Sequence, residues 1–183
     1  MAGEQPLAGM EVVVLVDEGV EDLEYWVTVM RLREAGANVT SVGTKLDAVH
    51  GKNGLAVQAD RLVDDVDPAA VDGIVIPGGW APDKMRRSPG IKGLVRAVND
   101  AGKPVGIICH GGLVAISAGI VEEGHPATGS LGIRDDLENA GARWVDEPAI
   151  RDGNLVWGRV VDDIPAFEAE LVAALAESRG SRD

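Results

Sequence analysis

The stretch "KPVGIICHGG" occupies residues 103–112 and joins a short apolar run to a cysteine, a histidine and two glycines. An apolar run of this length is typical of a strand that is buried in a parallel sheet. The apolar segment "LVAISAG" (113–119) follows directly, so the whole region predicts a strand, a sharp turn and a helix. A strand-to-helix elbow holds its central residue, here Cys109, in a strained conformation and projects its side chain away from the backbone. Such a turn needs small residues close by, and the glycines around Cys109 meet that need.

The rest of the chain alternates between strand and helix patterns. Strands are predicted at 10–16, 37–43, 73–79, 104–109, 142–147 and 154–161. Helices are predicted at 23–36, 88–102, 113–119, 133–142 and 164–178, with a hairpin around Lys52-Asn53-Gly54. This order predicts an α/β fold with a mostly parallel sheet and helices on both faces. We expect a single domain over residues 1–183, with flexible tails at about 1–9 and 178–183.

Composition excludes several classes of function. The chain of 183 residues carries a formal net charge of −13 and no basic stripe, which argues against nucleic acid or an anionic membrane as a partner. One cysteine cannot form an internal disulfide, and the three histidines lack the spacing of metal ligands. No apolar stretch resembles a signal peptide or a membrane span. We therefore expect a cytoplasmic protein that uses no metal and no cofactor.

Three predicted strands end on polar or glycine-rich segments. These segments are residues 18–22, 78–83 and 109–112. Ligands of open parallel sheets bind outside the carboxyl ends of the strands, so the sequence predicts a site where these segments meet. Neither a phosphate-binding loop of the Gly-x4-Gly-Lys-Ser/Thr type nor a Gly-x-Gly-x-x-Gly motif after the first strand is present.

Cys109 and His110 each allow two interpretations. A lone cysteine in a cytoplasmic protein is often a small buried apolar residue. At an elbow, however, the helix N-terminus is expected to lower the cysteine pKa and favour a nucleophilic thiolate. His110 is either an exposed loop histidine or a base that needs an orienting carboxylate.

The chain resembles the PfpI branch of the ThiJ/PfpI superfamily, whose fold is similar to the class I glutamine amidotransferase domain. The resemblance covers Met10 to about Ala176 and rests on "GVEDLE", "IPGGWAPDKMR", "GKPVGIICHGG", "ISAGIV", "GIRDDLENAGARWVDEP" and "DGNLV". It implies a flavodoxin-like three-layer sandwich with a nucleophile elbow.

The resemblance also implies residue roles. Cys109 matches the nucleophile, and Glu21 matches the acid whose protonated carboxyl hydrogen-bonds the sulfur, although Glu21 alone also fits a helix N-terminal acid. His110 matches the histidine that pairs with a carboxylate of a neighbouring subunit. The matching carboxylate is Asp83, which alone also fits a solvated loop acid or a helix cap. The backbone amides of Gly79 and His110 match the oxyanion hole.

Several positions depart from the PfpI pattern and concern the pocket. Gly112 stands where proline is usual, Ser130 where tyrosine is frequent, and Thr28 where the first helix has a proline. Trp80 follows the double glycine, and Trp157 precedes Gly158 where small polar residues are common. Pocket-lining candidates are therefore Trp80, Gly112, Ser130, Trp157 and Trp26. If two tryptophans meet there, the pocket is more apolar and more closed than usual.

The resemblance implies a cysteine-dependent, cofactor-free enzyme that acts on small reactive carbonyls, of the glyoxalase III or deglycase type, with a role in protection from stress. The alternatives are an intracellular cysteine peptidase of the PfpI type, a hydratase of small electrophiles such as isonitriles, and a non-enzymatic cysteine redox sensor. The expected partners are a small carbonyl substrate or a peptide, and further copies of the chain. In such a homodimer or higher homo-oligomer, Asp83 would complete the neighbouring site.

Overall fold

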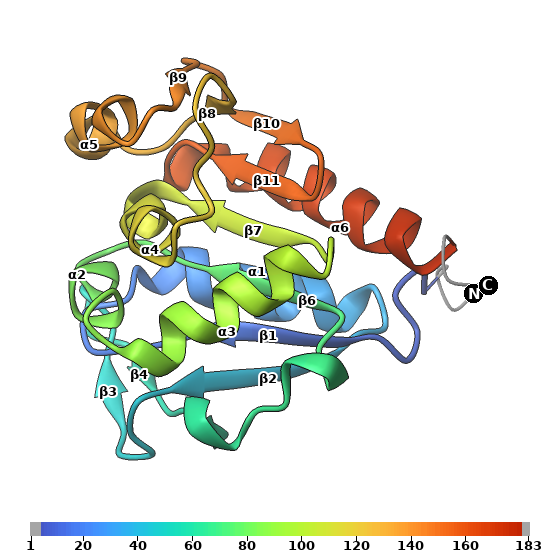
Figure 1. The fold of residues 1–183 in the computed structure, drawn as a ribbon. Coiled ribbons are helices and arrows are strands. Elements are labelled where there is room, and N and C mark those ends of the chain that lie inside the picture. The colour runs from blue at the N-terminus through green and yellow to red at the C-terminus, as the bar shows by residue number, and fades with distance from the viewer. Residues whose placement is uncertain (1–4, 181–183) are drawn as a thin grey trace.

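The structure is a computed structural model that describes residues 5–180. Its centre is a seven-stranded sheet in the order β10-β11-β7-β6-β1-β2-β5 (Figure 1). The strands are β1 Glu11–Leu15, β2 Asn38–Gly43, β5 Arg61–Leu62, β6 Gly73–Ile76, β7 Val105–Ile108, β10 Ala149–Asp152 and β11 Leu155–Gly158. Only β10 and β11 pair antiparallel; the other pairs of this sheet are parallel. The sheet therefore confirms the predicted fold class.

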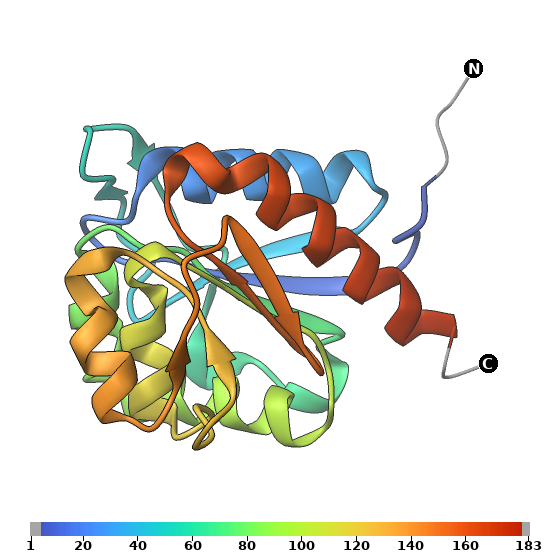
Figure 2. The same ribbon diagram turned by 90° about the horizontal axis from the view of Figure 1, so that it is seen from above.

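Helices cover both faces of this sheet. The helices are α1 Asp22–Glu34, α2 Ala81–Met85, α3 Pro89–Asp100, α4 Gly112–Ala118, α5 Arg134–Asn139 and α6 Ile164–Gly180. Figure 2 shows α1 and α6 together on one face, with α3, α4 and α5 on the other. None of the helices within residues 5–180 is long and apolar enough to cross a membrane. The parallel strands carry their carboxyl ends to one edge of the molecule, beside α2 and the start of α4 (Figure 1).

Two small ladders lie outside the main sheet. One pairs β3 Val49–His50 with β4 Ala56–Val57, which confirms the predicted hairpin. The other pairs β8 Pro126–Ala127 with β9 Arg143–Trp144. The strand predicted at 142–147 is therefore only two residues long and does not join the main sheet. The predicted elements do not include α2, β5, β8 and β10, because each of these is only two to five residues long and takes its order from neighbouring elements.

Parts of the predicted tails, residues 1–4 and 181–183, lie outside the described residues. Leu7 is fully buried and its N–H donates to the Ala35 carbonyl (2.9 Å), while α6 continues to Gly180. Leu7 therefore belongs to the core, and residues 178–180 belong to helix α6.

Helix α1 buries a face that mixes polar side chains with the apolar Tyr25, Val29 and Leu32. The apolar residues that predict this helix include Leu23, Val27 and Met30, yet these three side chains are 50%, 37% and 62% exposed. Glu24 and Thr28 lie on the buried face instead, one helical turn apart. The presence of the helix is confirmed, but its hydrophobic periodicity does not identify its buried face.

Glu168 of α6 is a second buried carboxyl that meets this face. It is 3% exposed and accepts a hydrogen bond from the Thr28 hydroxyl through Oε1. Its Oε2 has no hydrogen-bond partner within residues 5–180. Burial raises the pKa of Glu168 to about 7, against the opposing effects of the Thr28 hydrogen bond and the Arg31 charge.

This pKa predicts that Glu168→Gln stabilises the protein at neutral and higher pH. The folded protein holds the proton of Glu168 more tightly than the unfolded chain. In the wild type, the stability that comes from this proton is therefore fully present below the unfolded pKa of 4.5 and is lost as the pH rises to about 7. We expect the variant to gain about 3 kcal/mol of unfolding free energy at pH above 7, and little at acid pH. Urea unfolding across a pH series measures this difference. The control is Glu170→Gln, an exposed position of the same helix; equal pH dependence of wild type and Glu168→Gln would contradict the prediction.

Candidate active site

Cys109 occupies the strand-to-helix elbow that the sequence predicts. It follows β7 directly, lies in a single 3-10 turn (Cys109–Gly111), and precedes α4. Its φ of 58° is the only positive φ of a non-glycine residue within residues 5–180. This left-handed conformation is strained for a side chain with a Cβ atom, and such strain is concentrated at functional sites. The side chain is partly buried and its thiol is free.

Glycines allow the neighbouring chain segments to approach this turn. A Cβ atom on Gly111 would lie 2.3 Å from the Ile76 carbonyl oxygen. A Cβ atom on Gly78 would lie 2.7 Å from Glu24 Oε2 and 2.8 Å from the Cβ of Cys109. Both contacts are closer than side chains tolerate, so the elbow and the loop after β6 require glycine at these two positions.

Glu24, and not Glu21, is the carboxyl beside the cysteine. The Glu24 side chain is fully buried, and its Oε2 accepts from the N–H of Gly78 (2.7 Å), the residue that also lies against the Cys109 side chain. Its Oε1 has no hydrogen-bond partner within residues 5–180, and its charge acts on the Cys109 thiol. The prediction that Glu21 holds this position is therefore wrong. The reason is helix register: Glu24 lies one turn inside α1 on its buried face, whereas Glu21 precedes the first turn.

Glu21 has a structural role that the sequence analysis also considered. Its Oε2 accepts from the N–H of Glu24 (2.9 Å) and thereby caps α1, and its Oε1 accepts from Asn53 Nδ2 (3.0 Å). The spacing of two glutamates three residues apart at a helix start is the pattern of a capping pair. In the sequence, this spacing indicates that Glu21 caps the helix and that Glu24 lies inside it.

The carboxyl and the thiol compete for one proton. Burial raises the pKa of Glu24 to about 7. Burial, and then the Glu24 charge, raise the pKa of the Cys109 thiol to about 12, whereas the backbone amides of His110 and Gly79 lower it. The expected lowering by the helix start is therefore outweighed by burial. When Glu24 holds the shared proton, the sulfur is a thiolate that accepts hydrogen bonds from Glu24 and from both amides.

The His110 side chain lies beside the Cys109 thiol. Its Nδ1 is 3.4 Å from the Cys109 Sγ. Burial, and then the Lys52 charge, lower the pKa of His110 below its ordinary value. The imidazole is therefore neutral near pH 7 and can accept a proton. The backbone amides of His110 and Gly79 both lower the pKa of the Cys109 thiol, so both lie close to the sulfur.

Asp83 does not reach His110 within one chain. It belongs to α2, its side chain is 58% exposed, and it pairs with Arg87 of the same short helix. A role in the site would require Asp83 of another copy of the chain.

Of the pocket-lining candidates, Trp80 and Ser130 lie next to the elbow. Trp80 follows Gly79, is 67% exposed, and packs against the backbone of Gly19. The N–H of Ser130 donates to the Cys109 carbonyl (3.3 Å), so the loop that contains Ser130 borders the site.

The other candidates do not form an apolar pocket. Trp157 is 1% exposed and belongs to the core, and Trp26 lines a separate cavity of about 370 Å³ together with Tyr25. Gly112 is buried. It packs closely on Ile133, since a Cβ atom on Gly112 would lie 2.8 Å from the Ile133 side chain. The tryptophans do not meet at the site, so the condition for a more apolar and more closed pocket is not fulfilled. Within residues 5–180, no cluster of three His, Cys, Asp or Glu side chains is arranged to hold a metal ion.

This geometry predicts that Glu24→Gln moves the reactivity of Cys109 to lower pH. The Glu24 charge raises the pKa of the Cys109 thiol, and a glutamine amide carries no charge. We expect alkylation by iodoacetamide at pH 8, where Glu24 is ionised, to rise about tenfold, the effect of one pKa unit. Intact mass spectrometry across a pH series measures the rate, and the matched control Glu21→Gln should retain the wild-type profile. Superimposable profiles of Glu24→Gln and wild type would refute this assignment.

Comparison with known proteins identifies the family of the chain. Residues 10–174 match the DJ-1/PfpI family. Deglycase TK1284 from Thermococcus kodakarensis is 38% identical over 166 residues, which cover 91% of this chain and 99% of that protein. Protein/nucleic acid deglycase 2 from Escherichia coli is 35% identical over 168 residues, which cover 90% of this chain and 97% of that protein.

A solved structure shares both the fold and part of the sequence. It is a two-domain protein from Anabaena variabilis with DJ-1/ThiJ/PfpI-like and ferritin-like domains. It superposes with a TM-score of 0.88 at 36% identity, over 91% of this chain and 48% of that longer chain. The family match covers the cysteine elbow, the double glycine and the first turn of α1, and it confirms the resemblance seen in the sequence: the chain belongs to the DJ-1/PfpI family.

Proposed function

We propose that the protein is a cysteine-dependent, cofactor-free enzyme that acts on small reactive carbonyl compounds, of the deglycase or glyoxalase type. The observation that carries the proposal is the set of groups around the Cys109 sulfur. A carboxyl with a pKa of about 7, two backbone amides and a neutral histidine converge on one thiol at a strained elbow. The names of the relatives support the deglycase type, because several of them are named deglycases.

The first step would be addition of the Cys109 thiolate to the aldehyde carbon of an α-oxoaldehyde such as methylglyoxal. A carbon–sulfur bond forms, and the electron pair of the C=O bond moves to oxygen. The amides of Gly79 and His110 would stabilise that oxygen, and the protonated Glu24 would donate its proton to give a neutral hemithioacetal. The Glu24 carboxyl and the Cys109 side chain both lie against Gly78, so the sulfur and its proton donor are neighbours.

The next steps would transfer protons and need no external oxidant. The neutral His110 would remove the C–H proton of the hemithioacetal and return it to the adjacent carbon. The proton of the hemithioacetal hydroxyl would pass to the former keto oxygen, so the adjacent carbon becomes the hydroxyl-bearing carbon. The former aldehyde carbon is then a thioester. Water cleaves the carbon–sulfur bond and releases a hydroxy acid and the free thiol. The sum is addition of one water to methylglyoxal to give lactate.

A deglycase would use the same thiol on a different substrate. In the adduct of methylglyoxal with an amine, Cys109 would displace the amine and form the same hemithioacetal. Free methylglyoxal and its amine adduct therefore distinguish glyoxalase from deglycase activity. Release of the amine faster than its spontaneous dissociation would assign deglycase activity.

This proposal predicts turnover of methylglyoxal to lactate without added cofactor. We expect Cys109→Ser to abolish turnover, and His110→Gln to lower kcat about 100-fold or more, because a general base contributes at least that factor. Lactate formation measured by an enzyme-coupled assay tests both variants. Absence of turnover in the folded wild type would refute the proposal, and cleavage of fluorogenic peptides that depends on Cys109 would support a peptidase instead.

We also propose that the site is completed by a second copy of the chain through Asp83. Two observations support an oligomer. Asp83 is exposed beside the site but does not contact His110 of its own chain. In addition, α1 exposes Leu23, Val27 and Met30 at the spacing of one helix face, and such apolar surfaces are typical of protein interfaces.

A mixing experiment tests this arrangement. Asp83→Asn and Cys109→Ser should each be inactive alone. If the site combines Cys109 of one chain with Asp83 of another, random mixed oligomers of equal amounts should regain about a quarter of the wild-type activity, because one site in four has both intact residues. Turnover after co-refolding measures this recovery. Mixed oligomers without recovery, or an active Asp83→Asn alone, would contradict the shared site.

A further inference from the structure

The turn between β3 and β4 brings a lysine to the candidate site. The turn is anchored by Asp22, which is 2% exposed: its Oδ2 accepts from the N–H of Asn53 (2.7 Å) and its Oδ1 from the N–H of Leu55 (2.8 Å). A Cβ atom on Gly51 would lie 2.4 Å from the same carboxylate, so the turn packs directly on it. A buried carboxylate with two backbone donors fixes the position of this turn.

The same turn is joined to the segment before α1. The N–H of Lys52 donates to the Val20 carbonyl (2.8 Å), and the Asn53 amide donates to Glu21. Val20 in turn forms a β-bridge with Gly79, whose amide points at the sulfur. Lys52 is therefore held by a continuous set of backbone contacts that ends at the oxyanion-binding amide.

The Lys52 side chain is exposed, and its charge reaches both residues that flank the nucleophile. It acts on Glu24 and on His110, and it lowers the pKa of each. No salt bridge of Lys52 forms within residues 5–180.

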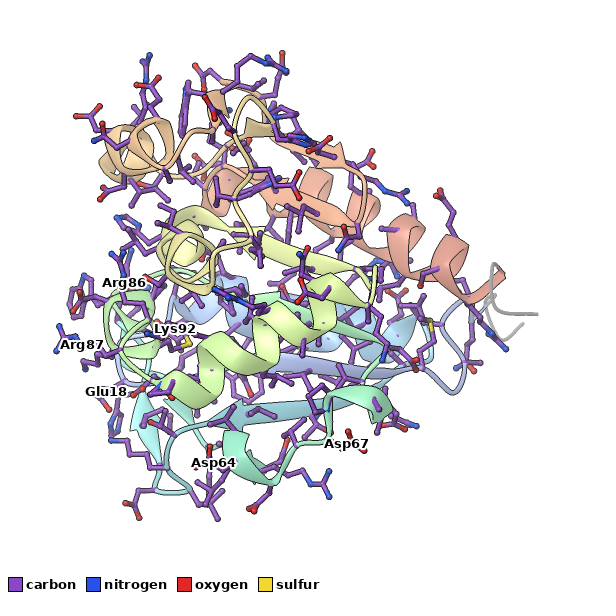
Figure 3. All side chains as sticks on the ribbon, viewed as in Figure 1. Glu18, Asp64, Asp67, Arg86, Arg87 and Lys92 are labelled. Carbon is purple, nitrogen blue, oxygen red and sulfur yellow. The ribbon has the colours of Figure 1, made fainter. Side chains whose placement is uncertain are left out.

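Other cations near this edge are already engaged. Arg87 pairs with Asp83 and points outward from α2, as Figure 3 shows, and Arg86 donates to Ser117 (2.8 Å). Lys84 donates to the Glu18 carbonyl (3.2 Å). Lys52 thus remains available to an incoming anion.

We propose that Lys52 determines substrate specificity: its ammonium group selects electrophiles that carry a negative charge close to the carbon that Cys109 attacks. An α-oxoaldehyde that ends in a carboxylate fits this chemistry. The contacts with Asp22 fix the position of the turn that carries Lys52. Glu24 and the neutral His110 carry no positive charge, so the Lys52 ammonium group is the positive charge beside the reacting group. The substrate class rests on the proposed carbonyl chemistry, whereas the charge selection itself does not.

Alkylation of the single cysteine tests the charge selection without any turnover. Iodoacetate is anionic and iodoacetamide is neutral, and both attack the same sulfur. A change in the amount of thiolate therefore cancels in the ratio of their rate constants. We expect Lys52→Met to lower the iodoacetate-to-iodoacetamide ratio by about threefold, the size of a partly exposed charge interaction. Lys52→Arg should retain the ratio, because it retains the charge.

Two further measurements separate charge from structure. Lys45→Met is the matched control, because Lys45 is exposed before β3 and does not act on Glu24 or His110; its ratio should equal that of wild type. Added salt should lower the wild-type ratio toward that of Lys52→Met and leave the variant unchanged. A ratio that is equal in wild type and Lys52→Met would overturn the proposal.

Turnover then tests the substrate class. The substrates are γ,δ-dioxovalerate, an α-oxoaldehyde that ends in a carboxylate, and its neutral methyl ester. Wild type should prefer the acid in kcat/KM, and Lys52→Met should lose about threefold of that preference. If neither compound is turned over, the proposed function fails, while the alkylation ratio still decides the role of Lys52. Turnover of both compounds with the same preference in wild type and variant would overturn the specificity role.

Discussion

The left-handed backbone at Cys109 is the constraint on which the site depends. A positive φ at a residue with a Cβ atom is unfavourable, so the surrounding structure must hold it in place. Gly111 and Gly78 allow that, because the chain passes the Ile76 carbonyl and the Glu24 carboxyl too closely for any side chain. The turn then directs the sulfur toward the amide of Gly79. The strained backbone of Cys109, the two glycines around it and the position of the Gly79 amide therefore depend on one another.

A second constraint is the orientation of α1. The helix places Glu24 and Thr28 inside and leaves apolar side chains such as Met30 outside. This arrangement is costly for a monomer, because carboxyls are rarely buried without a partner. Glu24 lies beside Cys109 and acts on the pKa of its thiol, and the Thr28 hydroxyl donates to Glu168. The inward face of α1 thus brings a carboxyl to the cysteine, while the outward face leaves apolar side chains exposed.

The β3–β4 turn shows how polar residues next to a site can act indirectly. Glu21 and Asp22 do not touch the sulfur; they cap α1 and hold the turn that carries Lys52. Three acidic residues within four positions therefore have three different roles: capping, anchoring and, for Glu24, the proton of the nucleophile. Their spacing along the helix start decides which role each one takes.

The sequence by itself determined the α/β architecture, the elbow at Cys109 and the neighbouring His110, because alternating apolar runs and glycine punctuation are local signals. It did not determine which acid meets the sulfur or which tryptophans lie in the core. Glu24, Trp157 and Lys52 acquire their surroundings from elements far away in the chain. Burial, pKa and charge at a site are set by such long-range packing, and only the tertiary structure decides them.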